Sequence, residues 1–186
     1  FYLGLSHLRR GDVAKGDLQN ARKHFERLLE NIPDTRFVCD AHLGLAESYQ
    51  AEGRFEDAGR VYSEAKERFE KMTRDASIEP AQIKGVRRYA RLAELGAAEM
   101  LDAREMWDKA YSAYTVLVSN SKDYSDIQMK AKTRAIRTLI KQKLYDRAIG
   151  RVLDMVEKGE QEGAAEHLGG AYLALADCYF ERAGEE

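Results

Sequence analysis

The feature that most constrains this chain is a four-residue pattern that occurs four times. An aromatic or large apolar residue is followed three positions later by Ala. A large residue stands four positions after that Ala, and another apolar residue follows after three more positions. The copies are Leu18/Ala21/Phe25/Leu28, Phe55/Ala58/Tyr62/Ala65, Trp107/Ala110/Tyr114/Leu117 and Tyr145/Ala148/Val152/Met155. Spacings of three and four place each set on one face of an α-helix. Each copy therefore predicts an amphipathic helix with a buried face.

The intervals between the copies indicate a repeat protein. Their first residues lie 37, 52 and 38 residues apart along the chain of 186 residues. Self-similarity at about 20–50 residues is typical of helical solenoids, and one enlarged unit accounts for the longest interval. No run of alternating β-branched residues suggests a sheet. The sequence therefore predicts an all-α solenoid of antiparallel helix pairs with four to five units.

The best-formed unit runs from Ala41 to Ala65. It has the form of two helices joined by a tight turn at Gly53. Leu45, Ala46 and Tyr49 share one face of the first helix, opposite the repeated pattern of the second. Small residues let the two helices approach closely, and the aromatic residues fill the space beyond them.

These residues resemble the tetratricopeptide repeat family. The motif positions are occupied here by Leu45, Ala46, Tyr49, Gly53, Phe55, Ala58, Tyr62 and Ala65. The other units match in part, through Leu3, Gly4, Ala21, Phe25 and Pro33 in the first and Leu175, Ala176 and Tyr179 in the last. Glu105 and Lys143 stand where the third and fourth units would carry the turn Gly.

The resemblance implies one right-handed superhelical solenoid domain over residues 1–186. Its units would be approximately 1–33, 34–75, 77–120, 125–159 and a truncated 164–186. The long repeat spacing and the Pro33-Asp34-Thr35 segment are also similar to bacterial envelope repeat proteins of the outer-membrane-assembly kind.

Helix signals divide the chain further. We expect helices over 1–10, 18–31, 39–52, 55–72, 80–104, 107–118, 126–142, 144–158 and 165–182. We expect side-chain caps from Asp17, from Asp34 or Thr35, from Ser77 and from Ser125, because short polar side chains accept the free N–H groups of a first turn. Pro80 suits the start of the long helix, where a missing N–H costs little.

Composition excludes some classes of function. The formal net charge is −2 and the pI about 6.2, which argues against nucleic-acid binding. No apolar run reaches the roughly 20 residues that span a bilayer, and no signal-peptide pattern opens the chain. The chain begins at Phe1 within a predicted helix, so we expect a fragment. The compartment stays open between cytoplasm and bacterial periplasm or envelope.

The sequence offers little chemistry. His7, His24, His42 and His167 fall in different units, without the partners that a zinc site needs. Cys39 and Cys178 belong to distant units, so no disulfide is expected between them. No glycine cluster forms a phosphate loop, and no nucleophile, base and orienting group stand together. We therefore predict no enzyme activity, no cofactor and no metal.

A solenoid instead presents a continuous inner surface, lined mainly by the first helices of its units. The resemblance implies inner-face positions at Leu5, Leu8, Arg9, Leu43, Glu47, Gln50, Leu95, Glu99, Asp102, Lys130, Arg134, Arg137, Lys141, Leu173, Asp177 and Phe180. From these we predict peptide contacts by Leu43, Glu47, Leu95, Glu99, Lys130, Arg134, Arg137, Lys141, Leu173 and Asp177. Leu5 would add an apolar contact.

Within this set, Lys130, Arg134, Arg137 and Lys141 form a basic stripe at i, i+4, i+7 and i+11 on one helix. Two interpretations stay open. The stripe holds an acidic peptide, a terminal carboxylate or a phosphate, or it is neutralised across the groove by Asp177, Glu181 and Glu99.

The chaperone-binding clamp of the family is not matched, because Leu43, Glu47 and Glu99 replace its basic and amide residues. The sequence predicts a non-enzymatic scaffold that binds a protein or peptide segment in its concave groove. The alternative is a self-association module that pairs through terminal surfaces near Tyr179 and Phe180. Neither function involves nucleic acid or membrane insertion.

Overall fold

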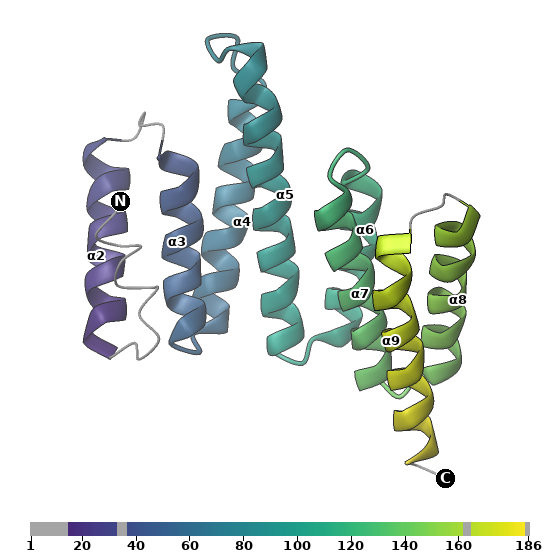
Figure 1. The fold of residues 1–186 in the computed structure, drawn as a ribbon. Helices are drawn as coiled ribbons and strands as arrows, with labels where there is room; N and C mark the ends of the chain where they lie inside the picture. The colour runs from purple at the N-terminus through teal and green to yellow at the C-terminus, as the bar shows by residue number, and fades with distance from the viewer. Residues whose placement is uncertain (1–14, 33–36, 162–164, 185–186) are drawn as a thin grey trace. The chain divides into compact units, whose positions relative to one another are not determined.

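The computed structural model describes residues 15–32, 37–161 and 165–184, and this part of the chain is helical without strands. Its elements are α2 (Lys15–Asn31), α3 (Val38–Ala51), α4 (Phe55–Met72), α5 (Pro80–Ala103), α6 (Trp107–Asn120), α7 (Ser125–Lys141), α8 (Tyr145–Gln161) and α9 (Ala165–Ala183), drawn in Figure 1. The all-α prediction is confirmed. The expected helix 1–10, with Leu5, Leu8 and Arg9, lies outside the described residues.

The chain forms two compact units, which we call unit 1 (residues 1–104) and unit 2 (residues 105–186). In unit 1, α2 packs on α3, α3 on α4 and α4 on α5; in unit 2, α6 packs on α7, α7 on α8 and α8 on α9. Helix α7 also lies beside α9. The boundary at 104/105 falls inside the expected repeat 77–120. A single continuous solenoid domain therefore stays a prediction.

The core of unit 1 is built from the repeated small and aromatic positions. Ala58, Ala65 and Phe69 of α4 are fully buried. A Cβ atom on Gly96 would lie 2.5 Å from Cε1 of Tyr62, and one on Gly44 would lie 2.5 Å from Cζ of Phe25. Both glycines are needed because an aromatic ring of the neighbouring helix occupies the space of a side chain.

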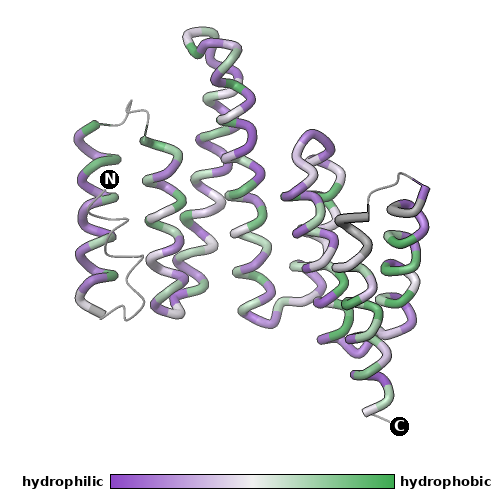
Figure 2. The backbone as a smooth tube through the Cα atoms, in the orientation of Figure 1, coloured by the Kyte–Doolittle hydropathy of each residue, from purple (hydrophilic) through white to green (hydrophobic). Residues whose placement is uncertain are grey.

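Unit 2 repeats this construction with larger residues. Tyr114, Leu117, Ile127 and Val152 are fully buried, and Cys178 of α9 packs into the same cluster as Val152. Burial of one such side chain contributes about 1.5–3 kcal/mol. Figure 2 shows hydrophobic residues recurring along each helix, which gives the helices of both units amphipathic faces.

The turns that follow α3, α5 and α7 each contain a residue in the left-handed conformation. Gly53 has φ +75°, and its N–H donates to the carbonyl of Gln50 while the Arg54 N–H donates to that of Tyr49. This pair of bonds is a Schellman motif. Lys143 closes the same motif with φ 60°, and Glu105 has φ 58°. Non-glycine residues thus adopt left-handed conformations at the positions where the sequence lacks the turn Gly.

The expected side-chain caps are partly wrong. Glu79, and not Ser77, is the N-cap of α5, and the Ser77 N–H and hydroxyl both donate to the Asp75 carboxylate. Ser125 is the first residue of α7, preceded by Tyr124 as N-cap. Asp17 lies within the first turn of α2, where its charge favours the helix dipole. Pro80 opens α5 as expected.

Candidate functional site

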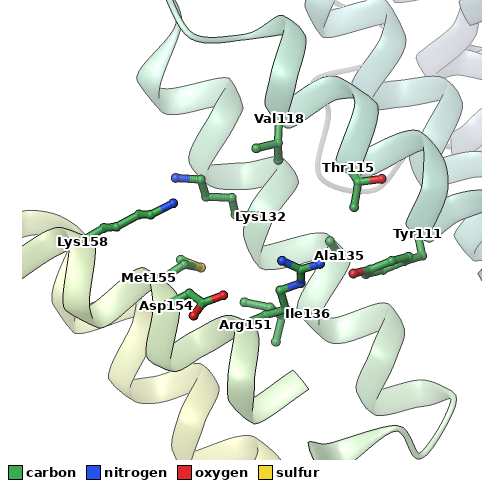
Figure 3. Close-up of a pocket in the computed structure, with 10 residues that line it drawn as sticks. All are labelled: Tyr111, Thr115, Val118, Lys132, Ala135, Ile136, Arg151, Asp154, Met155 and Lys158. Carbon is green, nitrogen blue, oxygen red and sulfur yellow. The ribbon is translucent and has the colours of Figure 1, made fainter. Parts of the chain in front are cut away.

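Unit 2 contains a cavity of about 270 Å³ between α6, α7 and α8 (Figure 3). Its lining residues are Tyr111, Thr115, Val118, Lys132, Ala135, Ile136, Arg151, Asp154, Met155 and Lys158. We call it the α6–α8 pocket. Each helix contributes a stripe at helical spacing, such as i, i+3, i+4 and i+7 on α8, so three amphipathic faces converge on one space.

The α6–α8 pocket is rich in cations. Its lining contains the cations Lys132, Arg151 and Lys158 and a single carboxylate, that of Asp154. Within the described residues, none of these four side chains takes part in a hydrogen bond or ion pair. A fourth cation, the Arg147 guanidinium, lies 5.6 Å from the centre of the Tyr111 ring. The pocket therefore carries an unbalanced positive charge.

The basic stripe predicted from the sequence lies on another part of α7. Lys130, Arg134, Arg137 and Lys141 are all exposed. Arg137 forms no ion pair with Asp177 in the described structure, so the expected neutralisation is absent at this pair. Arg134 and Lys141 do have interactions within the protein.

Helix α9 lies beside α7 and repeats its burial pattern 40 residues later. Buried Ala131 and Thr138 of α7 correspond to buried Ala171 and Cys178 of α9. The predicted contact residue Leu173 is 70% exposed and Phe180 is 80% exposed. Asp177 is also exposed. Helices α7 and α9 thus expose both cationic and apolar side chains to solvent.

The predicted contact residues of unit 1 have a different environment. Leu43 is half-buried against the core, and Leu95 is only 7% exposed, which leaves Leu95 little area for a ligand. Glu47 is exposed and Glu99 half-buried, and both already interact within the protein. The predicted contact residues of unit 1 are therefore either acidic or partly to fully buried.

Tyr62 lies near the acidic residues Glu47 and Glu99. Burial raises the pKa of its hydroxyl, and the nearby carboxylates of Glu47 and Glu99 raise it further. The hydroxyl donates a hydrogen bond to Oε1 of Gln50 at 3.1 Å. Tyr62 is therefore a neutral, bonded core residue.

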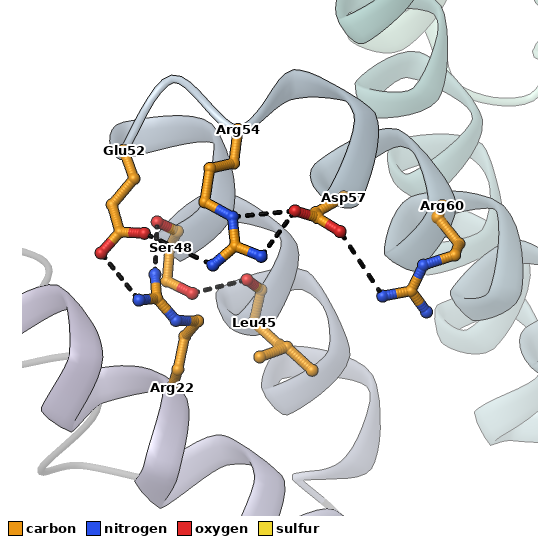
Figure 4. Close-up of polar contacts among 7 residues, drawn as sticks. All are labelled: Arg22, Leu45, Ser48, Glu52, Arg54, Asp57 and Arg60. Atoms are coloured by element: carbon orange, nitrogen blue, oxygen red, sulfur yellow. Dashed lines mark hydrogen bonds and ion pairs between the residues drawn. The ribbon is translucent and has the colours of Figure 1, made fainter.

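Unit 1 also holds a polar network that the sequence patterns did not reveal (Figure 4). An Arg22 guanidinium nitrogen lies 2.7 Å from Oε1 of Glu52, and their side chains are 9% and 7% exposed. Arg22 also donates to the carbonyl of Ser48 at 3.4 Å. Arg22 and Arg54 both lie over the Tyr49 ring, at 4.9 and 4.6 Å from its centre. These contacts fasten α2 to α3.

A second group joins α4 to α5. Arg91 pairs with Glu70 at 3.0 Å and with Glu94, whose other oxygen lies 3.6 Å from Nζ of Lys66. The charges of this group balance, so it is a structural network and not a site for a charged ligand.

The remaining titratable groups show no catalytic arrangement. Burial raises the pKa of the Cys39 thiol to about 12, which keeps it a neutral thiol. Burial, assisted by Arg68, lowers the pKa of His42 to about 4. Across the described ranges, no group of three His, Cys, Asp or Glu side chains is placed to hold a metal ion.

The packing and turn geometry define an all-α helical repeat protein. Residues 1–35 match the family model of the tetratricopeptide repeat, which confirms the predicted resemblance. No curated protein matches the sequence. The likeness to bacterial envelope repeat proteins stays a prediction.

A solved structure supports the same fold. The chain is similar to the crystal structure of BtubC (BKLC) from P. vanneervenii, with 19% sequence identity and a TM-score of 0.59. The match covers 89% of this chain and 64% of that chain, so the present sequence spans under two thirds of its length. In the part of the chain that the structure describes, no helix is both long and apolar enough to cross a membrane.

Proposed function

We propose that this protein is a non-enzymatic scaffold that binds a peptide or protein segment along the first helices of its repeats. Helical repeats of the tetratricopeptide kind commonly mediate protein–protein interaction. Within unit 2, the proposed surface consists of the basic stripe of α7 together with Leu173, Asp177 and Phe180 of α9.

The observation that carries this proposal is the exposure of the α7 stripe beside exposed apolar residues of α9. Exposed apolar side chains next to exposed charged side chains are typical of a binding surface. The charge favours an acidic segment, and Leu173 and Phe180 favour one that also carries apolar side chains. Rigid packed helices would lose little entropy when such a segment docks.

Charge reversal tests the proposal. The probe is a synthetic peptide of alternating Glu and Leu, followed by fluorescence anisotropy. The double substitution Lys130→Glu and Arg137→Glu should weaken binding about tenfold or more, which corresponds to about 1.4 kcal/mol. Lys122→Glu, a reversal at an exposed site between α6 and α7, is the matched control. Equal binding by all three proteins would refute the proposed surface.

Self-association is the second candidate. Tyr172, Leu173, Tyr179 and Phe180 of α9 are between 47% and 80% exposed, and a second copy can cover such residues. Sedimentation velocity distinguishes the two functions. A concentration-dependent dimer that Phe180→Glu dissociates supports self-association, whereas a monomer that binds the acidic probe supports the scaffold.

A further inference from the structure

We propose that the α6–α8 pocket binds a phosphate monoester dianion carried on a small apolar group. Nothing in the expected inner-face function uses this pocket. Its lining stripes differ from the α7 basic stripe, since Lys132, Ala135 and Ile136 face the pocket while Lys130, Arg134 and Arg137 belong to the other set.

Charge selects the ligand. Three cationic side chains against one carboxylate leave a formal net charge of about +2 among the lining residues. A phosphate monoester carries about −1.5 to −2 under the same conditions. Its charge therefore matches that of the pocket, whereas a monoanion would leave a net positive charge.

The cationic groups of the pocket come from two helices and converge in part. In Figure 3 the amino groups of Lys132 and Lys158 point toward one another from α7 and α8, while Arg151 extends toward Tyr111. Two like charges that converge without a carboxylate between them repel, and an anion held between them removes that repulsion. Arg151 adds a planar fork that suits two phosphate oxygens.

The rest of the lining fits an apolar body. Val118, Ala135, Ile136 and Met155 supply aliphatic or thioether contacts next to the cations. The Tyr111 hydroxyl forms no hydrogen bond within the described residues, so it is available to an ester or phosphate oxygen. A volume of about 270 Å³ lies just below the range of roughly 300–1,000 Å³ common for ligand pockets, which limits the ligand to a small group.

Isothermal titration calorimetry with phenyl phosphate tests the proposal. We expect binding that is tighter than that of inorganic phosphate, because the ring gains apolar contacts. Binding should weaken as pH falls through the second pKa of the phosphate, near 6. Phenyl sulfate, a monoanion of similar shape, should bind at least several-fold more weakly.

Three variants sharpen the test. Lys132→Gln and Arg151→Gln should each weaken phenyl phosphate binding about tenfold, whereas Asp154→Asn should strengthen it several-fold because it removes the one carboxylate among the described lining residues. Lys122→Gln, outside the pocket, should change nothing. Helical circular dichroism checks that each variant is folded.

A short neutral peptide containing phosphotyrosine distinguishes two sources of the ligand. Tighter binding of the peptide than of phenyl phosphate would identify a phosphorylated protein side chain, and exclusion of the peptide would identify a small free ester. A dissociation constant weaker than about 1 mM for both probes would overturn the proposal. So would binding that none of the pocket substitutions changes.

Discussion

The polar networks of unit 1 and the α6–α8 pocket of unit 2 differ in whether their cations have carboxylate partners. In unit 1, the buried Arg22 and the partly buried Arg91 are matched by the carboxylates of Glu52 and Glu70, at 2.7 Å and 3.0 Å. In unit 2, Lys132, Arg151 and Lys158 line a cavity and form no ion pair with any described carboxylate. Paired charges interact mainly with each other inside the fold, whereas unpaired charges can interact with a ligand. The difference favours unit 1 as framework and unit 2 as binding surface.

The largest expected effect comes from breaking the charge pairing of unit 1. Arg22→Ala removes the shorter ion pair of the buried Glu52 side chain and leaves only Arg54, at 3.8 Å, so the free energy of unfolding should fall by about 3 kcal/mol, the low end of the cost of breaking a buried pair. Arg60→Ala removes an exposed pair with Glu64, in which both side chains are 57% exposed, and should cost only about 0–1 kcal/mol. Urea titration measures both. Equal losses would contradict the distinction between buried and exposed pairing.

His42 should make the stability of unit 1 depend on pH. Its folded pKa of about 4 lies below the ordinary 6.5, so the unfolded chain binds the proton first as pH falls. Stability is complete above pH 6.5 and should decline between 6.5 and 4, by up to about 3 kcal/mol. The buried Nε2 atom has no hydrogen-bond partner in the described structure, consistent with a neutral ring. Urea titrations of wild type and His42→Gln across this range test the point, and the variant should lose this part of the slope.

Gly→Ala substitutions at two positions of α5 distinguish the effect of side-chain packing on stability from the effect of helix propensity. Gly96→Ala places a methyl group against the Tyr62 ring and should destabilise by about 1–3 kcal/mol. Gly85→Ala meets no atom within 4 Å and should stabilise by up to about 1 kcal/mol, because Ala is the better helix former. Thermal denaturation should give shifts of opposite sign. Shifts of the same sign would show that ring packing does not control this interface.

The smallest effect compares the matching turns of the two units. Gly53→Ala should destabilise by about 1 kcal/mol, because it places a Cβ atom in the left-handed conformation. Lys143→Gly relieves that strain in unit 2 and should stabilise by about 0.5–1 kcal/mol. Chemical denaturation of the two variants checks both signs. A destabilised Lys143→Gly would mean that the Lys side chain contributes more than the turn costs.

The sequence predicted the helices well because each carries its own periodic apolar face. Even the substituted turns at Glu105 and Lys143 were located by the repeat, although only the structure shows their left-handed φ values. The caps at Ser77 and Ser125 were less predictable, because a short polar side chain can bind locally, as Ser77 does with Asp75.

The candidate sites were only partly predictable. The α7 stripe lies on one helix, so the family resemblance and the spacing of its residues were enough to predict it. The α6–α8 pocket needs residues of three helices, and its signal on α8, Arg151 with Asp154 and Lys158, resembles an ordinary solvated face. The buried state of Leu95 and the Arg22–Glu52 pair depend on how helices pack, which no single-helix pattern records.

The most direct test of the account is an NMR titration of the isotopically labelled protein with the Glu/Leu probe peptide. The account predicts chemical-shift changes concentrated on the amides of α7 and α9, which weaken as salt is added because the interaction is partly between charges. Changes concentrated on α3 and α5, or no saturable change at all, would contradict the claim that unit 2 carries the binding surface.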